Sequence, residues 1–177
     1  MRDHPIDPRR VYAAGLSAGG AAAAILGVTY PDLYAAIGVH SGLPCGAASD
    51  VASAFAAMRQ GRSPAPGSSR PSIAVPTIVF HGDRDTTVNP VNGDQVVAQT
   101  EADAKSRTTV RRGIAPGGIG YTCTVRADDG GRPMSEHWVL HGAGHAWSGG
   151  SPAGSCTEPH GPDVSREMLR FFLLQQG

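Results

Sequence analysis

Residues 11–30 read VYAAGLSAGGAAAAILGVTY, and the centre of this stretch, Gly15–Gly19, has the pattern Gly-x-Ser-x-Gly. The β-type run before it (Arg10–Leu16) and the alanine-rich run after it (Ala18–Tyr30) predict a strand, a sharp turn and a buried helix. Such a turn lifts Ser17 above the sheet edge, and a side chain at either flanking glycine would clash with neighbouring backbone. The stretch therefore predicts a strand–nucleophile–helix unit, with a glycine-rich loop and an incidental serine as the alternative.

The rest of the chain alternates short apolar strands with helices. Strands are predicted at Ala35–His40, Val75–His81 and Glu136–His141, and helices at Asp50–Gln60, Asn92–Ala104 and Asp163–Gln175. Thr108–Arg126 alternates weakly and predicts a β-hairpin or an irregular excursion. This order indicates an α/β fold with a mostly parallel sheet and flanking helices. With 177 residues, we expect a single domain (1–177) with a loop-rich excursion at about residues 43–72.

Composition excludes several classes of function. Fifteen basic and fifteen acidic residues give a net charge of +0, which argues against nucleic acid or an anionic membrane as the main partner. No stretch approaches the roughly 18 apolar residues of a membrane helix. The three cysteines form no CxxC pair, and His137, His141 and His145 fall on a strand and a glycine-rich turn, where four-residue spacing makes no common face. The sequence therefore predicts no metal and no cofactor.

A serine nucleophile needs a histidine base, which in turn needs an orienting carboxylate. The run HGDRD leaves a predicted buried strand and offers Asp83 and Asp85, at the end of a parallel strand where active sites form. The run HGAGHAW leaves the last strand, and its two glycines free the loop to orient His145. The residues alone leave both aspartates as candidates for the acid.

These blocks resemble those of the polyhydroxybutyrate-depolymerase-like esterases, a family of the α/β-hydrolase superfamily. The similar blocks, within a resemblance that extends from Val11 to Leu173, are GLSAGG (15–20), HSGLP (40–44), HGDRDTTV (81–88) and EHW…HGAGHAWSGG (136–150). The resemblance implies Ser17 as nucleophile, His145 as base and the backbone amide of Ala18 as an oxyanion donor. It also implies Asp85 as the acid, because the family pattern HGxxD places the acid last, and Asp83 would then cap or brace the loop.

The implied activity is that of a serine carboxylesterase acting through an acyl-enzyme on short-chain acyl or hydroxyalkanoate (polyester-type) esters. Feruloyl and acetyl esters are further substrates that the resemblance allows. Trp147 and His40 are expected to line the substrate pocket, with plain packing for Trp147 and a hydrogen-bonded structural role for His40 as the alternatives. The partner is thus a small ester or a polyester, and the family resemblance implies a secreted protein.

The chain departs from the family pattern at its N-terminal side. The resemblance leads us to expect strands before the nucleophile and a loop that supplies a second oxyanion amide, so we expect a shortened chain that lacks both. Loss of one oxyanion donor typically costs about 10²–10³ in turnover. The alternative function is therefore a catalytically inert or weakly active truncated hydrolase domain.

Two further expectations accompany this departure. The strand at Val11 would form an unprotected sheet edge, through which a homo-oligomer could pair. Cys123 and Cys156 flank the segment of the base, and they stand where relatives of the family usually have other residues. A disulfide between them is a hypothesis that follows from this comparison.

Overall fold

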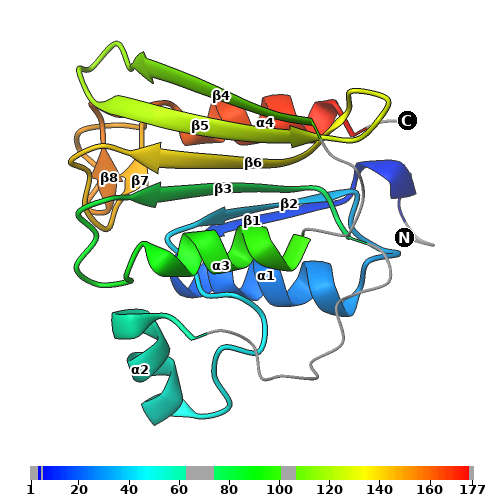
Figure 1. Ribbon diagram of the computed structural model, residues 1–177, viewed down its shortest axis with the longest axis horizontal. Helices are drawn as coiled ribbons and strands as arrows, with labels where there is room; N and C mark the ends of the chain where they lie inside the picture. The colour runs from blue at the N-terminus through cyan, green and yellow to red at the C-terminus, as the bar shows by residue number, and fades with distance from the viewer. Residues whose placement is uncertain (1–3, 5, 63–73, 101–106, 176–177) are drawn as a thin grey trace.

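The computed structural model describes residues 4, 6–62, 74–100 and 107–175, and its centre is a six-stranded sheet (Figure 1). The strands are β1 (Tyr12–Leu16), β2 (Ala36–His40), β3 (Thr77–Gly82), β4 (Arg107–Ile114), β5 (Gly120–Ala127) and β6 (Pro133–Leu140). The helices are a short 3-10 turn (Pro8–Arg10), α1 (Ala18–Thr29), α2 (Val51–Gln60), α3 (Val91–Thr100) and α4 (Val164–Leu173). A second, two-stranded sheet pairs β7 (Trp147–Ser148) with β8 (Thr157–Glu158).

The strand order in the large sheet is β1-β2-β3-β6-β5-β4. Strands β1, β2, β3 and β6 run parallel, whereas β5 and β4 form an antiparallel hairpin beside β6. The predicted α/β fold with a mostly parallel sheet is confirmed. The weakly alternating segment is the hairpin and not an irregular excursion, since β4 and β5 stay in register from Arg107↔Ala127 to Ile114↔Gly120.

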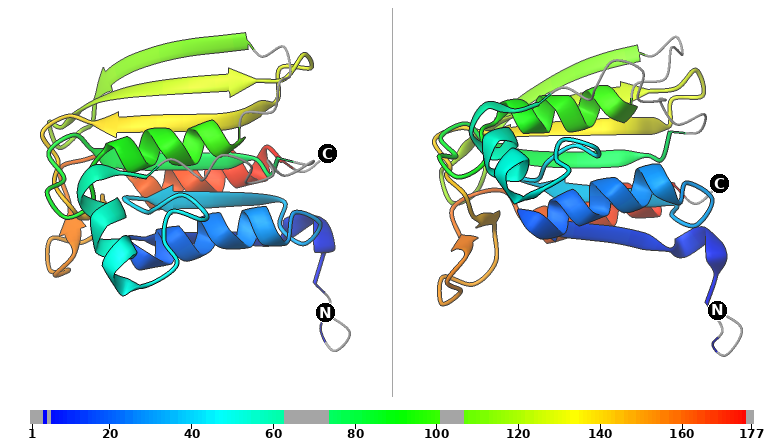
Figure 2. Two further views of the ribbon diagram at one scale, coloured as in Figure 1. Left: turned by 60° about the horizontal axis from the view of Figure 1, so that its bottom comes forward. Right: turned by 90° about the horizontal axis from the view of Figure 1, so that it is seen from below.

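Helices cover both faces of the sheet, with α1 and α3 on one face and α4 on the other (Figures 1 and 2). The alternation of side chains along β3 supplies both cores, because Ile78 and Phe80 face α4 while Val79 faces α1 and α3. Phe171 of α4 packs in the first core and Val96 of α3 in the second. Burial on both faces explains why β3 reads as an almost continuous apolar run.

Element boundaries differ from the predictions where tertiary pairing extends or ends an element. Strand β6 begins at Pro133, before the predicted Glu136, because its register with β5 continues to Ala127↔Pro133. Helix α2 has the predicted N-cap, Asp50, whose carboxylate accepts the amide of Ser53 at 2.8 Å. Residues 63–73 and 101–106, which include the end of the predicted loop-rich excursion and the end of the helix predicted at Asn92–Ala104, lie outside the described residues.

The structure overturns the disulfide hypothesis and agrees with the predicted sheet edge at β1. Cys123 and Cys156 are both free, so the disulfide hypothesis is wrong. Cys123 is fully buried within β5, whereas Cys156 is exposed. Strand β1 is an edge strand of the sheet, as predicted. Among the described helices, none combines the length and the apolar character needed to cross a membrane.

Candidate active site

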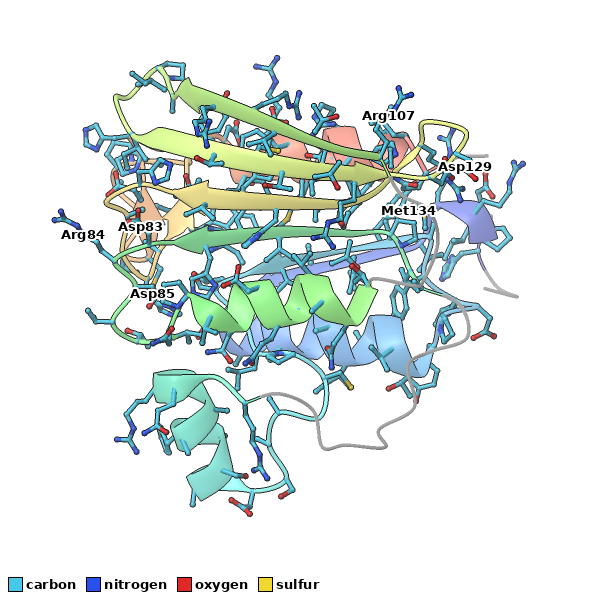
Figure 3. All side chains as sticks on the ribbon, in the orientation of Figure 1. Asp83, Arg84, Asp85, Arg107, Asp129 and Met134 are labelled. Carbon is cyan, nitrogen blue, oxygen red and sulfur yellow. The ribbon has the colours of Figure 1, made fainter. Side chains whose placement is uncertain are left out.

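The candidate catalytic side chains come from loops at one end of the sheet. Parallel strands place their carboxyl ends at the same edge, and β1, β3 and β6 lead into the loops that contain Ser17, Asp85 and His145. Figure 3 shows Asp83 and Asp85 in the loop that leaves β3, at the end of the sheet where β7 and β8 lie. Topology thus gathers segments that are far apart in the sequence.

Ser17 occupies a strained turn between β1 and α1. Its backbone has φ 57° and ψ −118°, and a positive φ costs a non-glycine residue about 1–3 kcal/mol. Surrounding contacts hold this conformation, since the amide of Ser17 donates to the carbonyl oxygen of His40 at 2.9 Å. The hydroxyl of Ser17 makes no hydrogen bond with any residue that the structure describes. Ala18 is the first residue of α1, where a backbone amide has no acceptor within the helix.

The two glycines that flank the serine have different roles. A Cβ atom at Gly15 would lie 2.4 Å from the carbonyl carbon of Gly19, so a side chain at position 15 cannot fit. A Cβ atom at Gly19 itself would meet nothing within 4 Å. The prediction that a side chain at either glycine would clash is therefore correct for Gly15 and wrong for Gly19, because only the backbone of Gly19 is approached closely.

Asp85 and His145 form a hydrogen-bonded pair. The Nδ1 atom of His145 lies 2.7 Å from Oδ2 of Asp85, whose side chain is fully buried. The other carboxylate oxygen accepts the amides of Thr87 and Val88, each at 2.9 Å. Burial alone would raise the pKa of Asp85, but hydrogen bonds from His81, from the Val88 amide and from His145 outweigh it and lower that pKa. Asp85 is therefore an ionised carboxylate that can fix the imidazole tautomer of His145.

A second acid–histidine pair braces the same two loops. Asp83 accepts the amide of Gly142 at 2.7 Å, and its second oxygen lies 3.0 Å from Nδ1 of His141. The Nε2 atom of His141 is 2.9 Å from the hydroxyl of Thr122 on β5. With both ring nitrogens engaged, His141 links the loop after β3 to the loop after β6. Asp83 thus has the predicted bracing role, whereas no motif in the sequence singles out His141 as its partner.

His40 and Trp147 lie together beside the base loop. Their rings stack with centroids 5.6 Å apart, and Trp147 is half-buried with its indole N–H donating to the Ser165 hydroxyl at 3.1 Å. His40 is 0% exposed, so no surface of its ring is open to a substrate. This placement argues against the predicted pocket role of His40 and for a hydrogen-bonded structural role. A pocket role for Trp147 stays a prediction.

The described residues offer no obvious metal centre. No group of three or more His, Cys, Asp or Glu side chains lies close enough together to bind an ion there. The three regularly spaced histidines, His137, His141 and His145, each face a different acid: Asp94, Asp83 and Asp85, respectively. The arrangement instead fits acid–base chemistry at single imidazoles.

The chain is similar to known esterases and depolymerases. A family model described as Esterase PHB depolymerase matches residues 1–105, which include Ser17 and Asp85. The Poly(3-hydroxyalkanoate) depolymerase C of Paucimonas lemoignei is 31% identical in an alignment of 157 residues that covers 81% of this chain and 36% of that protein.

Two solved structures share the fold. An acetyl xylan esterase from Aspergillus awamori aligns with a TM-score of 0.64 at 18% identity, over 98% of this chain and 62% of that one. A PHB depolymerase from Penicillium funiculosum aligns with a TM-score of 0.59 at 21% identity, over 94% of this chain and 52% of that one. The chain thus spans between about a third and two thirds of the length of these relatives. Because the family model matches more than half of the residues of this chain, the chain belongs to the Esterase PHB depolymerase family.

Proposed function

We propose that this chain is a serine carboxylesterase that hydrolyses short-chain acyl or hydroxyalkanoate esters. The observation that carries the proposal is the 2.7 Å hydrogen bond between His145 and the buried Asp85, at the sheet edge where Ser17 is held at φ 57°. A serine on a strained strand-to-helix turn and an imidazole oriented by a buried carboxylate are two of the parts that acyl transfer needs, and the proposed mechanism adds the approach of the Ser17 hydroxyl to Nε2 of His145.

The mechanism assigns one task to each of these residues. Nε2 of His145 takes the proton of the Ser17 hydroxyl as the serine oxygen attacks the ester carbonyl carbon. The tetrahedral oxyanion is stabilised by the amide of Ala18 at the N-terminus of α1. His145 then protonates the departing alcohol, leaving an acyl-enzyme, and the neutral imidazole activates a water molecule that releases the acid. Throughout, Asp85 keeps Nδ1 of His145 protonated and stabilises the imidazolium.

The substrate class is supported by the names of the relatives. One is named a poly(3-hydroxyalkanoate) depolymerase and another an acetyl xylan esterase, so the names point to hydroxyalkanoate and acetyl esters. Short acyl and hydroxyalkanoate esters are therefore the substrates to test first. Export of the protein stays a prediction from the family resemblance.

Hydrolysis of p-nitrophenyl butyrate by the purified chain, beside Ser17→Ala and Asp85→Asn, tests the proposal. We expect activity that vanishes with Ser17→Ala and falls by about 10⁴ with Asp85→Asn, because the asparagine favours the wrong imidazole tautomer. Equal, near-background rates in the wild type and Ser17→Ala would instead support the inert truncated domain. Labelling of Ser17 by a fluorophosphonate probe gives a second readout that does not depend on the ester chosen.

A further inference from the structure

His40, the last residue of β2, contacts both the turn that contains Ser17 and strand β7, which directly follows the loop of His145. Its carbonyl oxygen accepts the amide of Ser17 at 2.9 Å. Its ring Nε2 lies 3.3 Å from the backbone nitrogen of Ser148, which follows His145 by three residues. One buried residue therefore touches the two segments that must bring the nucleophile and the base together.

The contacts of the ring determine its tautomer. A backbone amide can only donate, so Nε2 of His40 must be unprotonated in order to accept the amide of Ser148. The proton then resides on Nδ1, which lies 3.1 Å from the hydroxyl oxygen of Ser41 and donates to it. Protonation of Nε2 would set one N–H group against another in a site without solvent.

The surroundings of the ring keep it neutral. Its faces stack against Phe80 and Trp147, with centroids 6.0 Å and 5.6 Å away. Burial, together with the neighbouring imidazoles of His81 and His145, lowers the pKa of His40 to about 3, and Asp85 opposes this shift only in part. The ring is therefore neutral over the whole range in which an esterase base works.

We propose that His40 is a positioning residue, whose neutral Nδ1–H tautomer holds Ser148, and with it the loop of His145, against the turn of Ser17. The role rests on the proposed esterase function, and it is separate from the catalytic chemistry because the buried ring touches no substrate. Backbone strain marks the same place, since Ser41 has φ 47°. The end of β2 thus presents a hydrogen-bond acceptor to β7, directly after the loop of His145.

Amide hydrogen exchange tests the contact directly in the wild type, His40→Gln and His40→Leu. Leucine is of similar size but accepts no hydrogen bond, whereas glutamine can present its oxygen near the position of Nε2. We expect exchange at Ser148 to be about tenfold faster in His40→Leu and close to wild type in His40→Gln. The amides of Trp147 and Gly149 are internal controls, because they donate at 2.8 Å to carbonyls of Cys156 and Glu158. Unchanged exchange at Ser148 in His40→Leu would overturn the proposal.

Kinetics and spectroscopy give independent readouts. We expect His40→Leu to lower kcat for p-nitrophenyl butyrate by about 10–100-fold at a similar KM, and His40→Gln to restore it to within a few-fold of the wild type. An equal loss of kcat in both variants would contradict a role for the hydrogen-bond acceptor.

If His40→Leu does not fold, ¹⁵N NMR of the wild type decides, because an Nε2–H tautomer of His40 contradicts the proposal. A wild type without Ser17-dependent activity refutes the esterase, whereas the exchange and tautomer results still test the contact.

Discussion

At the level of single residues, Gly15 and Gly19 shape the turn that contains Ser17. Gly15 passes so close to the backbone of Gly19 that hydrogen is the only substituent that fits on its Cα atom, and this contact presses the strand against the start of α1. Ser17, in the same tight turn, has a positive φ. The absence of a side chain at Gly15 is thus a requirement of the turn that holds the serine.

This difference between the glycines gives a matched pair of variants. Gly15→Ala should lower the free energy of unfolding by about 3 kcal/mol, because the new methyl group displaces the backbone of the elbow. Gly19→Ala should leave it unchanged or raise it by up to about 1 kcal/mol, because position 19 is helical and its Cβ meets open space. Urea denaturation of both variants measures the difference. Similar losses of unfolding free energy in both variants would show that position 19 tolerates a side chain no better than position 15.

The buried imidazole of His40 predicts a pH dependence of stability. Its pKa is about 3 in the folded protein and about 6.5 when unfolded, so the unfolded state binds more protons as the pH falls. The stability that this group contributes is complete above about pH 6.5 and declines towards pH 3 by about 1.4 kcal/mol per pH unit. Denaturation between pH 7 and 4 should show this slope in the wild type. His40→Gln should lack this part of the slope, while the contributions of His137 and Asp85 persist in both proteins.

Among the elements, α4 is attached to the sheet through a buried charge on β6. Glu136 is 2% exposed, and its Oε2 accepts the indole N–H of Trp138 at 3.0 Å and Nη2 of Arg170 at 2.6 Å. Arg170 also binds Glu167 on its own helix at 2.7 Å. Arg170 therefore places a cation beside an acid that is buried in β6, and this ion pair links α4 to the sheet.

Arg170→Ala should lower the free energy of unfolding by about 2–3 kcal/mol. The reason is that Glu136 would stay buried without its cation, although solvent access to Arg170 keeps the loss below that of a fully buried pair. The double variant Glu136→Gln/Arg170→Ala should be more stable than Arg170→Ala alone. Arg166→Ala, at an exposed position of the same helix, is the control. Equal losses in Arg166→Ala and Arg170→Ala would show that the ion pair contributes nothing.

At the scale of the whole molecule, the sheet has an edge at β1. Val11 and Ser17 direct their hydrogen-bonding groups to β2 and its flanking residues, so the alternating positions Tyr12, Ala14 and Leu16 direct theirs to the open edge. An unpaired parallel edge is a site for pairing with another chain. Association of two copies through β1 is therefore a prediction for the protein in solution.

Light scattering of the purified chain measures this association. We expect a dimer or a larger oligomer in the wild type and a monomer in Ala14→Lys, because a lysine on an exposed edge position opposes strand pairing. Ala98→Lys, at an exposed position of α3, should leave the oligomer intact. A monomeric wild type would contradict the prediction.

Local patterns in the sequence determined the fold class and pointed to the candidate catalytic residues. The alternation of apolar strands and helices specified the α/β class, since burial on one or both faces dictates the spacing of apolar residues. The glycines around Ser17 specified a tight turn, and loop glycines after buried strands pointed to Asp85 and His145. These features are readable because each depends on residues that are neighbours in the chain.

Tertiary structure decided what depends on residues that are distant in the chain. The pairing of β6 with β5 moved the start of β6 to Pro133, and the free thiols of Cys123 and Cys156 follow from where the sheet places them. The same packing buried His40 and turned its ring towards Ser148. No local pattern encodes these contacts, because the free energy of burial and hydrogen bonding depends on which segments the completed fold brings together.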